Sequence, residues 1–332
     1  MRAAVIGLAV WLSLALPSFA DDSGWCATQA SALADLQRHS DARGSAELSR
    51  ALRAQRWQSV KAQLALYADD APDFTPAERA VTARLRNSLA LIPLAAAGDD
   101  RAIRRRLADH ADPNIAVALD MWATPLAWAA GCNHLSTLRL LIAHGAEINR
   151  RFDFSLGGIS QGSTALIWAS RFGATDTVRE LLKLGADVTL AETSAGRPGS
   201  FTALDAAVSG EIAGMIVRAI LRQQEFSSAL DDGDAQIERL CRIDFVGVRY
   251  HLFHYVHVNH VTLHQIDRLI EIRDGATYVG AYWFTLESLH CDVAHRTIAF
   301  RNQRGAVERL IIGRGGLPAT ALIDGDNLRL DR

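Results

Sequence analysis

One short motif occurs three times in this chain, and it limits what the central region can fold into. Thr-Pro-Leu-Ala-Trp-Ala-Ala at residues 124–130 returns as Thr-Ala-Leu-Ile-Trp-Ala-Ser at residues 164–170 and as Thr-Ala-Leu-Asp-Ala-Ala at residues 202–207. The first two copies lead into a second apolar run that ends in Gly-Ala, at residues 145–146 and 185–186. Stacked repeats build an extended binding surface rather than a catalytic pocket. The repeat therefore predicts a protein whose task is recognition.

Each unit also carries local signals for two short helices. The hydroxyl of Thr164 can cap a helix, and Pro125 is tolerated in a first helical turn. Gly145 and Gly185 can end the second helix in the left-handed conformation, which a residue with a Cβ resists. The unit resembles the ankyrin repeat, which consists of a turn, two short helices and a projecting hairpin loop, here called a finger.

The resemblance covers residues 90–224 and implies an ankyrin-repeat α-solenoid of about four repeats. The first repeat is degenerate, and the fourth lacks Gly-Ala at its end, as expected of a terminal repeat. The resemblance further implies that the partner is another protein, bound by the fingers and the concave groove beside them. It implies no enzymatic activity and no cofactor.

The first twenty residues have the pattern of a secretory signal peptide. The positive Arg2 precedes an apolar run over residues 3–16, which is too short to span a bilayer, and residues 17–20 end in Ala20 after small residues. We expect cleavage after Ala20, giving a periplasmic or secreted bacterial protein without integral membrane association. The alternative is an N-terminal membrane anchor.

The remaining chain divides by its periodicity into further regions, so the predicted fold class is multidomain α+β. Residues 21–89 read as a helical N-terminal cap on the first repeat. A polar linker is expected at residues 225–234. Residues 235–332 alternate apolar and polar residues and contain the hairpin signal Asp274-Gly275. We expect a small antiparallel β domain there, with six to eight strands in a sandwich or open barrel.

Four cysteines in an exported protein predict up to two disulfides, for which three connectivities exist. Cys241 and Cys291 share the β-rich segment, and Cys26 and Cys132 lie in the helical part. We favour these two pairs, the first more strongly. The alternative is that Cys26 or Cys132 is a free buried thiol.

Most of the candidate partner-binding residues lie in loops that are longer than the ordinary ankyrin period requires. Arg171 and Phe172 instead match the two positions before the inter-helix glycine, which face the concave groove in ankyrin repeats. The extra residues fall at 150–162 and 191–199, and insertions of this kind often map to the binding face. Phe and Arg are also enriched in protein interfaces. The alternative for Phe152 and Phe154 is that they pack against the neighbouring finger. The candidates are Arg150, Arg151, Phe152, Phe154, Arg171, Phe172 and Arg197.

The sequence contains only weak signals for nucleic-acid binding, catalysis or metal binding, and we predict no catalytic residues and no metal ligands. A net charge of −2 argues against nucleic acid as a partner. Residues 158–162 match the Gly-x-Ser-x-Gly pattern of hydrolases, but they lie inside an expected finger rather than between a strand and a helix. Five histidines fall within residues 251–264. They support an alternative function, in which the β domain binds a metal or a small ligand in the periplasm.

Overall fold

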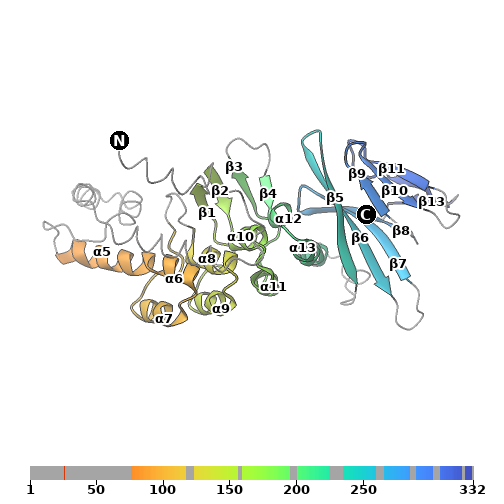
Figure 1. Ribbon diagram of the computed structural model, residues 1–332. Helices are drawn as coiled ribbons and strands as arrows, with labels where there is room; N and C mark the ends of the chain where they lie inside the picture. Colours follow the sequence, from red (N-terminus) through yellow and green to blue (C-terminus); the bar gives the residue numbers. More distant parts are fainter. Residues whose placement is uncertain are drawn as a thin grey trace.

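The computed structural model describes residues 26, 76–116, 123–155, 159–194, 200–223, 235–258, 265–284, 289–301, 307–323 and 326–330. The expected signal peptide, most of the expected N-terminal cap and the whole of the expected linker lie outside these residues. The first half contains the helices together with four short strands, and the second half consists of antiparallel strands (Figure 1). Within the described part of the chain, no helix is long and apolar enough to cross a membrane.

The helices form a stack of antiparallel pairs that begins after α5. The inner helices α6, α8, α10 and α12 contact one another in series, and an outer helix follows each of them (Figure 1). The bounds are α5 (Pro76–Leu89), α6 (Leu91–Ala97), α7 (Asp100–Ala108), α8 (Pro125–Gly131), α9 (Leu135–Ala143), α10 (Ala165–Arg171), α11 (Thr175–Lys183), α12 (Ala203–Ala206) and α13 (Gly210–Gln223).

The helix ends confirm the local signals read from the sequence. The hydroxyl oxygen of Thr164 accepts a hydrogen bond from the amide of Ile167 at 3.3 Å, and Thr202 forms a capping box with Asp205. Gly145 and Gly185 have φ values of 91° and 84°, in the left-handed region where a Cβ is disfavoured. Short local motifs therefore set where each helix begins and ends.

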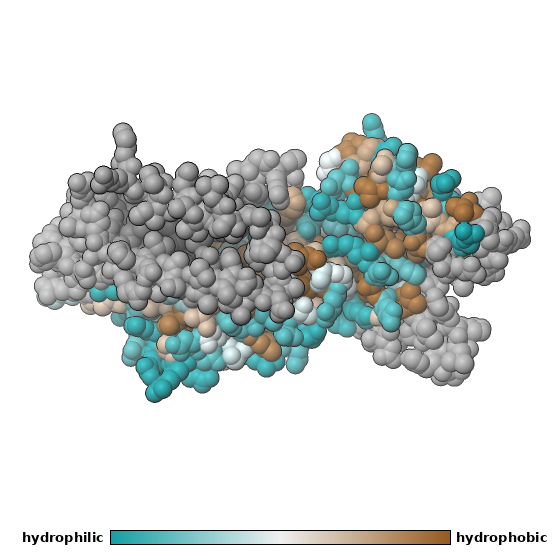
Figure 2. All heavy atoms as spheres, viewed as in Figure 1, coloured by the Kyte–Doolittle hydropathy of each residue, from teal (hydrophilic) through white to brown (hydrophobic). Residues whose placement is uncertain are grey.

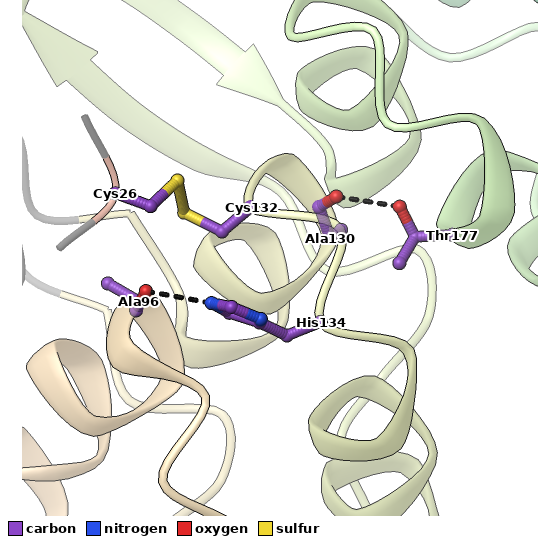
Figure 3. The surroundings of a disulfide bond; sticks show 6 residues. All are labelled: Cys26, Ala96, Ala130, Cys132, His134 and Thr177. Carbon is purple, nitrogen blue, oxygen red and sulfur yellow. Dashed lines mark hydrogen bonds between the residues drawn. A yellow bond between two sulfur atoms is a disulfide. The ribbon is translucent and has the colours of Figure 1, made fainter. Parts of the chain in front are cut away.

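Side-chain hydrogen bonds to backbone carbonyls join successive pairs (Figure 3). Nε2 of His134, at the start of α9, lies 3.0 Å from the carbonyl oxygen of Ala96 in the preceding pair. Thr177 on α11 donates its hydroxyl to the carbonyl oxygen of Ala130 at 2.7 Å. Both carbonyls lie near the C-terminal end of an inner helix, and that of Ala130 also accepts a hydrogen bond from the amide of Asn133 at 3.2 Å. The two side-chain hydrogen bonds fix the offset between neighbouring pairs.

The long loops form two hairpins that join into one sheet. The strands are β1 (Phe152–Ser155), β2 (Ile159–Ser163), β3 (Ala191–Ser194) and β4 (Ser200–Thr202), in the order β1-β2-β3-β4 and all antiparallel. The pairing between the two fingers runs through Ser160 with Ser194 and Gln161 with Thr193. The extra residues therefore build a four-stranded surface, here called the finger sheet.

The C-terminal part contains nine strands within the described ranges, where six to eight were expected, and they form three antiparallel sheets. The Asp274-Gly275 hairpin is confirmed between β7 and β8, with φ values of 50° and 71° at its two turn residues. The strands are β5 (Gln236–Phe245), β6 (Val248–Val258), β7 (Gln265–Arg273), β8 (Thr277–Phe284), β9 (Leu289–Asp292), β10 (Thr297–Arg301), β11 (Val307–Ile311), β12 (Thr320–Ile323) and β13 (Asp326–Arg329).

The sheet β5–β8 is buried on both faces. Phe253 and Ile270 belong to the hydrophobic core shared with the helices, whereas Leu252 and Leu269 pack with Phe300 of β10 in a second core. Helix α13 contacts β5 and β8, so the sheet covers the last helix pair (Figure 1). The fourth pair therefore ends against a sheet, without the polar outer face that a free terminal repeat needs.

Both cysteine pairs lie at disulfide distance, which is compatible with the predicted pairing. The Cα atoms of Cys241 and Cys291 are 6.2 Å apart, and those of Cys26 and Cys132 are 5.9 Å apart. The second pair attaches Cys26 to the C-terminal end of α8 (Figure 3). The first pair joins β5 to β9 and so links two sheets of the C-terminal part.

Candidate protein-interaction face

An aromatic cluster supports the base of the finger sheet. The ring centroid of Trp168 lies 5.2 Å from that of Trp128 and 5.4 Å from those of Phe152 and Phe172, and all three contacts are edge-to-face. Both tryptophans are almost fully buried, as expected for side chains that face the stack. Edge-to-face packing of this kind is favourable beyond the buried area alone. The cluster ties the first strand of the sheet to the inner helices.

Phe152 is buried and is not an exposed partner contact. Only 4% of its surface is accessible, because its ring packs on Trp168. This corrects the expectation of an exposed hot-spot residue, and the ring packs on Trp168 of the inner helix α10 where the alternative had placed it against the neighbouring finger. The side chain of Phe154 lies outside what the structure describes, although its backbone pairs with Ser160.

Arg151 holds the two fingers together. Its side chain crosses β2, and Nη2 donates to the carbonyl oxygen of Ala191 on β3 at 2.9 Å. The crossing requires Gly162, because a Cβ at this position would collide with the guanidinium group. Gly162 has a φ of 74° and donates its amide to Asp153. Arg151 is still exposed, so it remains accessible to a partner while it stabilises the sheet.

Arg171 and Phe172, at the C-terminal end of α10, also contact the repeats themselves. Arg171 forms a short ion pair with Glu192 of β3, whose side chain is buried. Phe172 is half-buried against Trp168 and packs over Gly131 of the preceding pair. These contacts connect the inner helix to the sheet, and they leave part of each side chain on the groove surface.

The remaining candidate arginines differ in what the structure describes of them. Arg150 is exposed and forms an exposed ion pair with Glu147 at 3.5 Å. An ion pair of this kind contributes little to stability, so it leaves Arg150 available to a partner. Arg197 lies in residues 195–199, outside the described ranges.

The exposed face of the finger sheet is polar. Arg151, Asp153, Gln161 and Thr193 point to solvent, while Phe152, Ser163 and Glu192 on the other face are buried. Gln161 and Thr193 are not among the candidates predicted from the sequence, which are all arginines and phenylalanines. The sequence carries no signal for them, because Ile-Ser-Gln-Gly-Ser in β2 and Ala-Glu-Thr-Ser in β3 do not alternate apolar and polar residues.

The described residues form neither a hydrolase-like site nor a metal site. Ser160 lies within β2 and pairs with Phe154 and Ser194, so it is not on the strand-to-helix turn that a nucleophile elbow requires. Among the residues with described side chains, no three His, Cys, Asp or Glu residues lie close enough to hold a metal ion. His257 has no described side chain, and residues 259–264 lie outside the structure's ranges.

His251 instead belongs to a buried ion cluster between the helices and the sheet. The carboxylate of Asp205 on α12 accepts hydrogen bonds from Nε2 of His251 and Nε of Arg249, each at 2.9 Å. A carboxylate can only accept, so Nε2 of His251 carries a proton. The other oxygen of Asp205 accepts from the amide of Thr202 at 2.9 Å. All of these contacts cross or adjoin the junction between the two halves of the chain.

The pKa of Asp205 lies below its ordinary value. Burial alone would raise this pKa, because it disfavours the charged form. The hydrogen bond and charge of His251, the amide of Thr202 and the charge of Arg249 outweigh burial and lower it. The carboxylate is therefore charged in the folded protein at neutral pH, and the cluster joins the helical and β-rich parts.

The comparisons with known proteins agree with the helical geometry. The family described as ankyrin repeats, in three copies, matches residues 91–192. This range contains α6 to α11 and the fingers as far as β3. A search of curated proteins gives no match to the chain. Ankyrin repeats indicate protein–protein interaction. Residues 91–192 of this chain are therefore similar to ankyrin repeats, in agreement with the resemblance read from the sequence.

Proposed function

We propose that this chain is an exported protein that binds one partner protein through its finger sheet and adjoining groove. The observation that carries the proposal is the continuous pairing of both fingers into a single sheet with a polar, exposed face. Such a face offers hydrogen-bonding groups in fixed positions. An adaptor or an immunity-type inhibitor of a secreted toxin is the role that we favour.

Export is supported by the pattern of residues 1–20 and by the two cysteine pairs at disulfide distance. Disulfides persist in oxidising compartments such as the periplasm. Mass spectrometry of the protein recovered from the periplasm should show Asp21 as the first residue. A protein that still starts at Met1, or that stays in the cytoplasm, would contradict export.

The binding face can be tested by affinity capture of partners from the periplasm. The double variant Gln161→Arg/Thr193→Arg places two bulky charges on exposed positions of the finger sheet. A matched control, Lys183→Glu, changes an exposed residue on the outer helix α11. We expect the finger variant to lose capture of any partner by about 30-fold or more, as for residues near the centre of an interface, and the control to keep it.

The capture results decide whether the finger sheet or another surface binds the partner. Equal capture by the wild type and the finger variant, with both folded, would place recognition elsewhere. Loss of capture with the outer-helix control alone would have the same meaning. For the inhibitor role, the purified partner should lose its activity at a 1:1 ratio with this protein, and an adaptor would leave that activity unchanged.

A further inference from the structure

The strand β11 forms an outer edge of the three-stranded sheet β11-β10-β9. It pairs with β10 over residues 307–311 and with no other strand in the described ranges. An edge strand presents backbone N–H and C=O groups that another strand can pair with. Figure 2 shows apolar residues interspersed with polar ones on the surface of this C-terminal half.

The hydrogen-bonding phase of the ladder shows which backbone groups are free. The amide of Ile312 donates to the carbonyl oxygen of Arg296 at 2.9 Å, which makes Arg296 and Ile312 a hydrogen-bonded pair. In an antiparallel ladder such pairs alternate, so Leu310 and Glu308 also direct their backbone groups toward β10. The backbone groups of Val307, Arg309 and Ile311 therefore point away from the sheet.

The same three residues carry exposed side chains. Val307 is 55% exposed and Ile311 is 64% exposed, and both lie on the same face of β11 with Arg309 between them. Arg309 is exposed, and no carboxylate among the described residues forms an ion pair with it. Among the described residues, this edge thus offers backbone groups without a strand partner, two exposed apolar side chains and a positive charge without an ion-pair partner.

We propose that β11 accepts an extended segment of a partner protein, which adds an antiparallel fourth strand to this sheet. The segment that fits has the pattern apolar–x–acidic–x–apolar. Its acidic residue would lie opposite Arg309 and its apolar residues opposite Val307 and Ile311, because directly opposite side chains share one face. Strand addition of this type gains affinity from main-chain bonds and specificity from alternate side chains.

A second copy of this chain fits the edge less well than such a partner. Antiparallel pairing of β11 with itself around Arg309 would place two arginines opposite each other, and like charges in that position are destabilising. The inward-facing, half-buried Glu308 is also a feature that limits edge-to-edge pairing between copies. The proposal therefore commits to a different chain, and it is independent of the finger sheet.

The test uses a synthetic peptide with blocked ends, Thr-Val-Thr-Glu-Thr-Val-Thr, added to the purified protein. Amide hydrogen exchange measured by NMR should slow at least about tenfold at Val307, Arg309 and Ile311, because strand addition protects these amides. Glu308 and Leu310 are already bonded and should change little. A peptide N-methylated at its two Val residues and its Glu should have no effect, since it cannot donate these bonds.

A charge exchange tests the specificity. Arg309→Glu should lower the affinity for the Glu peptide about fivefold. It should raise the affinity for the peptide with Lys in place of Glu by a similar factor. Equal melting temperatures of the variant and the wild type would confirm that the fold is intact. The proposal would be overturned if the amides showed no protection up to about 1 mM peptide. It would also be overturned if Arg309→Glu left the protection by the Glu and Lys peptides unchanged. Self-association through β11, seen by sedimentation, would also overturn it.

Discussion

Replacing Asp205 by alanine tests how much the buried ion cluster between the two halves of the chain contributes to stability. The Asp205 side chain is fully buried and Arg249 is only 10% exposed. The substitution leaves the guanidinium group and His251 without the acceptor that both share. Removing one partner of a buried ion pair costs about 3–5 kcal/mol, because an uncompensated charge stays behind. We expect the free energy of unfolding to fall by that amount in urea titrations followed by circular dichroism.

Two further variants test the contribution of this ion cluster to stability. Asp205→Ala/Arg249→Met should be more stable than Asp205→Ala alone by about 2 kcal/mol, since it also removes the buried guanidinium group that has lost its carboxylate. Asp176→Ala removes a carboxylate from an exposed ion pair with Arg179 on α11, and its loss should cost less than about 1 kcal/mol. The cluster would not act as described if Asp205→Ala were within about 1 kcal/mol of the wild type in its free energy of unfolding. The same would hold if Asp205→Ala/Arg249→Met were less stable than Asp205→Ala.

Three other predictions follow from the same packing. Phe152→Ala should destabilise the protein by about 3–5 kcal/mol in a urea titration, because the ring is buried on Trp168; an unchanged midpoint would mean that the ring is on the surface. The lowered pKa of Asp205 stabilises the fold above its unfolded value of about 4, and this stability should be lost as the pH falls through the folded value; thermal melts of Asp205→Ala should lack that part of the acid dependence. Cys241→Ser/Cys291→Ser opens a link with a sequence separation of 50 and should cost about 3–4 kcal/mol; labelling of both thiols in the unfolded, unreduced wild type would instead show that the bridge is absent.

The helix pairs were predictable from the sequence because their signals are local. A threonine cap, a first-turn proline and a terminal glycine each act within four or five residues, and Thr164 and Gly185 behave as their types require. The same holds for the Asp274-Gly275 hairpin. A helix end or a turn can be predicted from the sequence when the residues that determine it are its neighbours in the chain.

The candidate site was less predictable because its contacts are distant in sequence. Arg151 bonds to Ala191, and His251 bonds to Asp205, at sequence separations of 40 and 46. No nearby residue marks either one as a structural contact, so an arginine-rich finger and a histidine-rich strand both read as functional. One missed signal was local: Leu269 to Ile272 is nearly continuous in apolar residues, which is typical of a strand buried on both faces.

Joining the fingers has a consequence for how a partner would be recognised. A projecting hairpin that moves by itself must be immobilised on binding, and each ordered loop subtracts from the affinity. Here the backbone bonds between β2 and β3, together with the reach of Arg151, have already removed that freedom. Binding should therefore carry a small entropic penalty and discriminate sharply by shape, since a rigid surface cannot adapt to a poorly matched ligand.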